Sequence, residues 1–282
     1  MLICGRQFAP SEIDWIRSQI ENRPELKRAE LSRLFCRYAQ WRKSDGGLKE
    51  MSCRVALLRM EASGHIRLPA PTTNRVTVDG IKHTPRGNPQ PDLFFKAGEA
   101  NVVFEPVVRK TSSLWNELID RYHYLGYCRT GGAQMRFFVR AGGKLVALLG
   151  FSGAAWRVAS RDDFIGWSES QRKENLHLVV DNSRFLVLPW VHSKNLASRI
   201  LSRAARNLPD YWQERYHYRP LLMETFVEKN RFAATCYKAA NWTCVGETLG
   251  RGKRDRRKAF DKPVKTIWVY ALDRRFKERL CL

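Results

Sequence analysis

Residues 221–248 read LLMETFVEKNRFAATCYKAANWTCVGET, and this stretch decides the fold of the C-terminal part of the chain. Leu221–Val227 is a short apolar run of the kind that forms a buried strand, and Trp242–Thr248 has the same character. Between them, residues 231–240 place small and aromatic side chains at helical spacing. We therefore expect a strand, a helix and a second strand, with the helix packed on a sheet.

The same alternation continues on both sides of this stretch. Gly142 and Gly143 form a turn signal that predicts a hairpin of strands 134–140 and 144–151. The other elements expected are a helix at 113–124, a strand at 182–189, a basic helix at 194–207 and a strand at 265–272. Residues 107–282 should therefore form an α/β (α+β) domain on a mixed sheet.

The first 69 residues are patterned as helices. Three apolar stretches have helical spacing, and the third begins near Lys49, with Met51, Val55 and Leu58 on one face, and ends at Gly64. Residues 65–69 read as a short strand. Three helices and a strand are typical of a winged-helix DNA-binding module. The alternative is a helical bundle that docks on the rest of the chain.

In the winged-helix interpretation, the third helix would enter the DNA groove through its exposed face. That face would carry Lys49, Arg54 and Arg59. Residues 70–106 contain five prolines and three glycines, which is typical of a linker or an extended wrap.

The net charge of the chain narrows the range of functions that it could have. Lys and Arg number 50 against 28 Asp and Glu, which gives a net charge of +22 and a pI of about 10.1. Such an excess attracts polyanions, and nucleic acid is the first candidate because neutralised phosphates release counterions. An anionic membrane is the less favoured partner because the charge is not confined to one amphipathic helix. A soluble enzyme with a neutral substrate has no use for this charge.

Seven cysteines form no C-x-x-C pair and have no histidine at zinc spacing. The odd count predicts reduced thiols in the cytoplasm, and no apolar run is long enough for a membrane span. Cys36 and Cys53 read as helix core residues.

A basic run is the strongest local binding signal. Six cations surround one Asp in a loop that begins at Gly250, and a solvated loop without a partner is the alternative to phosphate contact. The cations are Arg251, Lys253, Arg254, Arg256, Arg257 and Lys258.

Glu224 is the candidate catalytic carboxylate. It lies within an apolar strand, where a charge is costly unless it is paired. One interpretation is a buried ion pair with Arg184, which could otherwise contact nucleic acid. The other is a carboxylate in a cleft where two parallel strands separate.

His123 follows a helix and could cap it, or act as a base. Together with Asp163 and Glu224, it could hold Mg²⁺ in a nuclease, although no spacing brings the three together. Asp162 and Asp163 could instead cap the segment at Phe164. Four tryptophans with arginine neighbours could form a base-stacking wall, although Trp190 and Trp242 also suit a core. The four are Trp156, Trp167, Trp190 and Trp242.

Residues 184–248, and the run NRFAATCYKAANW at 230–242 in particular, resemble the core of the GCN5-related N-acetyltransferase fold. In that family a tyrosine at the position of Tyr237 is a frequent general acid, although a helix core aromatic is the common alternative. The resemblance also implies a coenzyme A pyrophosphate loop at His192, Lys194, Asn195 and Ala197. The family's first glycine is Asn195 here, whose Cβ blocks part of the approach to a phosphate.

Longer segments resemble the DruA family of the Druantia anti-phage systems, which also occurs beside transposases. The segments are YHYLG (122–126), FIGW (164–167), NSRFL (182–186), LAS (196–198), ETFV (224–227), CYKAANW (236–242) and GETLGRG (246–252). The N-terminal segment resembles the family as well.

The resemblance implies action on DNA in defence or in transposon biology, with other defence proteins such as a helicase as partners. We therefore expect a DNA-binding component with a winged-helix-like module (1–69), a linker (70–106) and an acetyltransferase-like domain (107–282). The alternative is an enzyme on nucleic acid, either a metal-dependent nuclease or a degenerate acyltransferase. Those alternatives would use Mg²⁺ or acyl-CoA.

Overall fold

The computed structural model describes residues 1–3, 6–43, 46–70, 80–96, 98, 101–250 and 262–282. The chain divides into two compact units, Met1–Asp79 and Gly80–Leu282. Each unit has its own hydrophobic core and is described by itself. None of the helices in the described residues combines the length and the apolar character that crossing a membrane requires.

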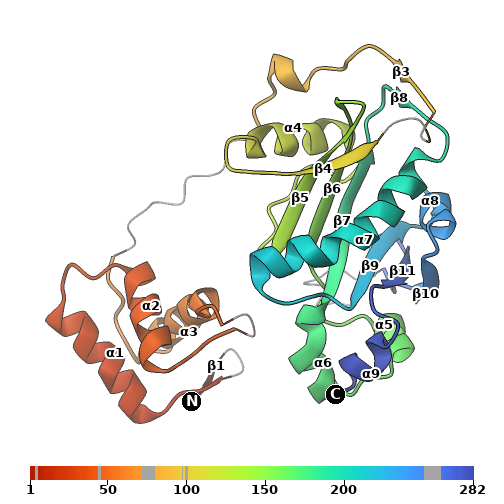
Figure 1. The fold of residues 1–282 in the computed structure, drawn as a ribbon. Coiled ribbons are helices and arrows are strands. Elements are labelled where there is room, and N and C mark those ends of the chain that lie inside the picture. Colours follow the sequence, from red (N-terminus) through yellow and green to blue (C-terminus); the bar gives the residue numbers. More distant parts are fainter. Residues whose placement is uncertain (4–5, 44–45, 71–79, 97, 99–100, 251–261) are drawn as a thin grey trace. The chain divides into compact units, whose positions relative to one another are not determined.

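The first unit is built from three helices. These are α1 (Pro10–Asn22), α2 (Arg28–Tyr38) and α3 (Glu50–Ala62) (Figure 1). They are preceded by two short antiparallel strands of two residues each, β1 (Leu2–Ile3) and β2 (Arg6–Gln7). Ile16, Phe35, Cys36 and Cys53 are fully buried between them. The expected three helices and the two core cysteines are confirmed.

The face of α3 that forms the core differs from the expected one. Cys53, Ala56, Leu57 and Met60 are buried, whereas the expected row is exposed at Met51, Val55 and Leu58. Apolar residues occur around most of this helix, so periodicity alone could not select the buried side. Packing against α2 decides it. Gly64 follows the helix with a φ of +74°, as expected for a helix end.

The strand expected at residues 65–69 is absent. This segment folds back on the helices instead: the amide of Leu68 donates to Glu61 Oε1, and Arg17 Nε donates to the His65 carbonyl. Ile66 and Leu68 are buried in the core. The wing of the winged-helix prediction therefore has no counterpart at these residues, because their side chains complete a helical core.

The second unit contains a seven-stranded sheet with the order β10-β11-β9-β7-β6-β5-β4. Within it, only β7 and β9 pair in parallel; the other neighbours are antiparallel. The strands are β4 (Val102–Pro106), β5 (Gln134–Ala141), β6 (Lys144–Gly153), β7 (Val179–Val187), β9 (Leu222–Glu228), β10 (Thr243–Glu247) and β11 (Lys265–Ala271). The expected α/β domain on a mixed sheet is confirmed.

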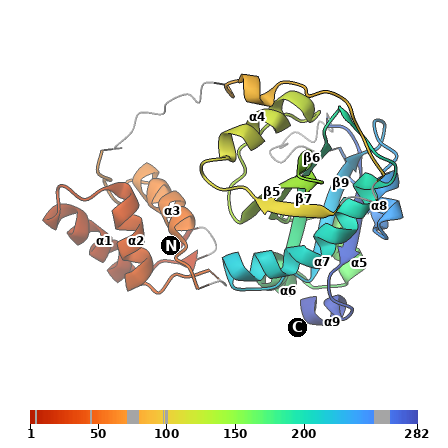
Figure 2. The same cartoon turned by 45° about the horizontal axis from the view of Figure 1, so that its top comes forward.

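Helices cover both faces of this sheet. Figure 2 shows α4 (Ser112–Tyr122) and the long α7 (Leu196–Tyr216) on opposite sides. The short helices are α5 (Ala159–Ile165), α6 (Glu169–Asn175), α8 (Thr235–Ala239) and α9 (Phe276–Leu280), with 3-10 turns at Pro85–Gly87 and Leu176–Leu178. A separate parallel ladder joins β3 (Leu93–Phe94) to β8 (Val191–His192).

Residues 80–106 belong to the second unit and not to a linker. β4 pairs with β5 along its whole length, and Val102 and Phe104 are buried in the core. Upstream of β4, the Thr84 amide and hydroxyl donate to Glu117 on α4. β4 is the last strand at one end of the sheet, and such an edge strand tolerates proline. Pro106, one of the prolines that suggested a linker, ends this strand.

Truncation tests this boundary. A chain of residues 80–282 should unfold in one transition, whereas residues 107–282 should melt at a markedly lower temperature. The shorter chain loses two buried side chains, Val102 and Phe104, each worth about 1.5–3 kcal/mol. Circular dichroism melting of both chains measures this, and equal melting temperatures would show that 80–106 adds nothing to the unit.

Candidate functional site

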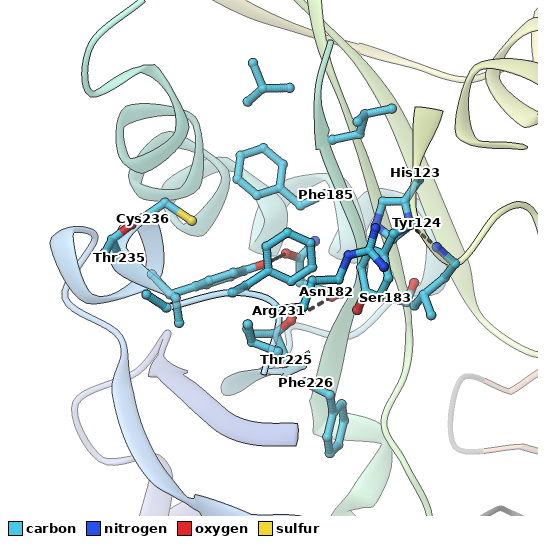
Figure 3. Close-up of a pocket in the computed structure, with 18 of the residues that line it drawn as sticks. His123, Tyr124, Asn182, Ser183, Phe185, Thr225, Phe226, Arg231, Thr235 and Cys236 are labelled. Atoms are coloured by element: carbon cyan, nitrogen blue, oxygen red, sulfur yellow. Dashed lines mark hydrogen bonds between the residues drawn. The ribbon is translucent and has the colours of Figure 1, made fainter. Parts of the chain in front are cut away.

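The central feature of the second unit is the place where β7 and β9 separate. The two strands pair only through Val179–Leu222, Val180–Met223 and Asp181–Glu224. Beyond that last pair lies a cavity of about 720 Å³ (Figure 3). Ligands of open α/β sheets commonly bind at the carboxyl ends of parallel strands, which is where this cavity lies.

The neighbours of β7 and β9 keep the gap open. β7 continues along β6, while β9 continues along β11 to Glu228. A β-bulge in the β6–β7 ladder makes Gly150 pair with Arg184 and Phe151 pair with Asn182, so Ser183 is an extra residue on β7. A bulge of this kind bends its strand locally. Each strand is therefore held by its outer partner rather than by the other.

Two segments form the walls of the cavity. The stretch from Arg231 through α8 lies on one side, and the end of α4 with residues 121–125 lies on the other. Tyr124 and Phe232 approach each other edge to face, with ring centroids 5.0 Å apart. The Arg231 guanidinium lies 4.8 Å from the Tyr124 ring centroid and 5.6 Å from that of Phe232. These residues lie within the segments 122–126 and 230–242 that carry the family resemblances, but the sequence analysis gave none of them a role.

The floor of the cavity is a closed network of polar groups. The Tyr237 hydroxyl donates to Asn182 Oδ1 at 2.9 Å, and the Asn182 amide donates to the Gly150 and Arg184 carbonyls. The Thr225 hydroxyl donates to the Asn182 carbonyl. Burial raises the pKa of Tyr237. Its proton is thus already donated to Asn182, which leaves the general-acid role of Tyr237 without support from this geometry.

His123 lines the cavity just after the end of α4. Its Nδ1 accepts the Leu125 amide at 3.2 Å, which leaves Nε2 as the protonated nitrogen of a neutral ring. Burial lowers the pKa of His123 to about 4, and the positive charges of Arg184, Lys265 and Arg231 add to this effect. His123 is therefore a neutral hydrogen-bond donor and not a charged helix cap.

Glu224 has a different partner from the expected one. Its Oε2 accepts a hydrogen bond from the Arg161 guanidinium at 2.8 Å, and its Oε1 accepts the Ala155 amide. Both side chains are fully buried. Burial raises the pKa of Glu224, and the Arg161 charge opposes that shift. Arg184 instead donates to the Gly126 and Ser183 carbonyls. An ion pair was one of the two interpretations of Glu224, but its cation comes from α5, 63 residues away in the sequence, and not from Arg184.

The three residues of the metal-nuclease interpretation are not brought together. Asp163 is exposed on α5, Glu224 is bonded to Arg161, and His123 faces the cavity. Across the described parts of the chain, no group of three His, Cys, Asp or Glu side chains is arranged to hold a metal ion. Asp162, not Asp163, supports the start of α5, because it accepts the Val158 amide.

The segment before α7 lies beside a second hollow of about 620 Å³. His192 is bonded to Asp92 and stacks on Phe94, so it is not directed at a ligand. Asn195 occupies the N-cap position of the helix with a φ of +63°, a left-handed conformation that favours glycine. Lys194 and Asn195 line the hollow, whereas Ala197 does not. This end of α7 suits a phosphate, whether from coenzyme A or from a polynucleotide.

The residues of the first unit that were predicted to contact nucleic acid differ in their exposure. Lys49 and Arg59 are exposed, whereas Arg54 is half-buried, bonded to Ser32 and 3.4 Å from Glu50. The six cations of the basic run, Arg251, Lys253, Arg254, Arg256, Arg257 and Lys258, lie outside the described residues and remain a prediction.

A row of arginines on α7 was missed. Arg199, Arg203 and Arg206 are exposed at positions i, i+4 and i+7, which places them on one helix face. None of the three forms an ion pair with a carboxylate in the described portion of the chain. We call them the α7 arginine row. Their spacing within an expected helix was the available signal.

The four tryptophans do not form a wall. Trp190 and Trp242 are buried in the core, as their alternative interpretation predicted, and Trp167 is buried as well. Trp156 alone among them is exposed, with the Arg172 guanidinium 5.5 Å from its ring centroid. Arginine neighbours in the sequence did not reveal which way each ring points.

Glu224→Ala should destabilise the protein by about 3 kcal/mol, because it leaves Arg161 buried without its main counter-charge. Urea unfolding measures the change. Glu169→Ala, which breaks an exposed pair with Lys173, is the matched control and should leave the midpoint nearly unchanged. An unchanged midpoint for Glu224→Ala would contradict the structural role of this pair.

The His123 imidazole should titrate with a midpoint near pH 4 in the folded protein, measured by NMR of its ring protons. Because its folded-state pKa lies below the ordinary value of 6.5, its contribution to stability is present above pH 6.5 and is lost as pH falls towards 4. A midpoint near 6.5 would mean that the ring is solvated and not enclosed by the cavity wall.

Solved structures similar to this chain include several acetyltransferases. An aminoglycoside acetyltransferase in complex with coenzyme A is 12% identical, with a TM-score of 0.40, and the match covers 64% of this chain and 98% of that one. The ribosomal-protein-S18-alanine N-acetyltransferase from Escherichia coli is 12% identical, with a TM-score of 0.37 and coverage of 61% and 95%. A Salmonella typhimurium acetyltransferase with acetyl-CoA is 14% identical, with a TM-score of 0.39 and coverage of 61% and 95%.

A search of curated proteins found no match. The family model described as Druantia protein DruA matches residues 99–273, which is more than half of the chain. The match begins just before β4 and ends just after β11, so it spans the sheet and its cavity and does not include the first unit. This chain therefore belongs to the Druantia protein DruA family.

Proposed function

We propose that this DruA-family chain is the DNA-binding component of a Druantia-type defence or mobile-element system. Membership of the family supports the biological setting. The net charge of +22 supports a polyanionic partner. The α7 arginine row is the observation that carries the proposal, because it gives that charge a defined place on a rigid element.

The geometry of the row suits a nucleic-acid backbone. Residues on a helix rise about 1.5 Å each, so guanidiniums four and three residues apart are separated by about 6 and 4.5 Å along the axis. Such distances allow each arginine to reach a successive phosphate, bidentately where the oxygens permit. The long helix is fixed to the sheet by buried Ile200, Leu201 and Ala204, so the row is held in place before DNA arrives.

Positive charge continues from the α7 arginine row to the start of the helix. Lys194 and Arg199 line the hollow at the N-terminus of α7 together with Lys96. The free amides of a helix start add a partial positive charge there. A phosphate in this hollow would therefore extend the backbone path that the arginines define. Contacts of this kind position a strand without reading its sequence.

Replacing Arg199, Arg203 and Arg206 with glutamine should weaken DNA binding and flatten its salt dependence. The slope of log K against log salt should fall by about 0.9 for each duplex phosphate that the variant no longer neutralises, or about 0.7 for each phosphate of a single strand. Labelled duplex and single-stranded DNA, titrated at several salt concentrations, provide the measurement.

The matched control removes the same charge from three separate exposed positions: Lys144, Arg157 and Arg274. Its salt slope should remain close to that of the unaltered protein. Equal behaviour of the two triple variants would refute the α7 row as the contact surface. If the unaltered protein binds no DNA near physiological salt, the DNA-binding function itself is wrong.

A further inference from the structure

The cavity between β7 and β9 has a rim made of flat groups. Tyr124, Phe232 and the Arg231 guanidinium all lie within 6 Å of one another by ring centroid or central carbon. Phe232 remains 44% exposed, although an apolar ring gains by burial. Planar groups at the mouth of a cavity are suited to stacking on a planar ligand.

The charge of the cavity favours an anionic ligand. The described residues that line it include Arg121, His123 and Arg231 but no Asp or Glu. Arg121 is already paired with Glu117. The Arg231 guanidinium has no carboxylate partner in the described portion of the chain, so it is available to an incoming phosphate.

Some polar groups of the cavity bond to one another, and others remain for contact with a ligand. Asn182, Thr225 and Tyr237 satisfy one another at the floor. His123 offers the Nε2 hydrogen, and the Ser183 hydroxyl can accept a hydrogen bond while it donates to Gly150. Thr235 and Cys236 also line the cavity, and its volume of about 720 Å³ lies within the range of small-molecule sites.

The cavity adjoins the path proposed above for the DNA backbone. Helix α8 is shared: Thr235, Cys236 and Tyr237 line the cavity, and Ala239 lines the hollow that also contains Lys194 and Arg199. A strand whose phosphates follow the α7 arginine row therefore passes the short helix that separates the two hollows.

We propose that this cavity receives one unstacked nucleobase of the bound DNA, which stacks on Tyr124 and Phe232 while Arg231 contacts its phosphate. The proposal rests on the DNA-binding function proposed above and adds a structural specificity to it. The protein would prefer DNA that already contains an unpaired base, because unstacking such a base costs least. Stacking tolerates any base, so the preference is for the defect and not for a sequence.

The test compares two long duplexes that differ at one bulged nucleotide, which is intact in one and abasic in the other. The full chain should bind the intact bulge about tenfold more tightly, as expected for the stacking of one base. Tyr124→Ala and Phe232→Ala should each bring this ratio towards one with an unchanged salt slope, and Phe232→Trp should restore it. Melting of each variant checks that it is folded.

Two controls separate this proposal from DNA binding itself. Trp156→Ala removes an exposed aromatic outside the cavity and should keep the tenfold ratio. The Arg199, Arg203 and Arg206 triple variant should bind both duplexes more weakly but keep the ratio between them.

A ratio of one for the unaltered protein, with salt-dependent binding intact, overturns the base-binding cavity and leaves the DNA-binding function standing. If the protein binds neither duplex, the base-binding cavity and the DNA-binding function are both wrong. A ratio of one combined with an acetyl-CoA-dependent rise in melting temperature, lost in Phe232→Ala, assigns the cavity to an acyl-CoA and also overturns the proposal.

Discussion

The second unit depends on one constraint, which is that β7 and β9 pair in parallel for only three residues. Each strand has a stronger attachment on its other side, β7 to β6 and β9 to β11. The sheet therefore stays continuous while its centre opens. The Arg161–Glu224 bond fixes α5 to the last paired residue of β9, so the point of separation is held by a buried charge pair rather than by side-chain packing alone. The position of the cavity, and of α8 beside it, follows from that point.

The distribution of charge around the separation point is asymmetric. Glu224 is neutralised by Arg161, and burial together with the neighbouring Glu224 raises the pKa of Asp181 well above that of an ordinary carboxyl. The carboxylate of Glu224 is bonded to Arg161 at the fork, whereas the cavity beyond it is lined by cations and a neutral histidine.

The extent of the family match agrees with the architecture. It begins near the first strand of the seven-stranded sheet and ends near the last, so the part of the chain that matches the family corresponds to the unit that contains the cavity and the α7 arginine row. The three-helix unit lies outside that match. Met51, Val55, Leu58, Lys49 and Arg59 lie on the surface of that unit, which has its own core.

The sequence by itself determined the order and type of most elements. The hairpin at Gly142 and Gly143, the apolar strands around Arg184 and Glu224, and the helix ended by Gly64 all follow local rules of spacing and backbone conformation. It also determined the charge and the family resemblance. Where apolar residues surround a helix, as in α3, the spacing was ambiguous, and a proline-rich stretch concealed the edge strand β4.

The tertiary structure decided which side chains meet. Arg161 and Glu224 are 63 residues apart, and the rim joins Tyr124 to Phe232 over more than a hundred positions. Nothing in local spacing specifies such contacts, because they depend on strand order, on the bulge at Ser183 and on the outer partners that draw β7 and β9 apart. Candidate residues could be named by chemical type from the sequence, but their partners could not, since burial and direction are properties of the assembled sheet.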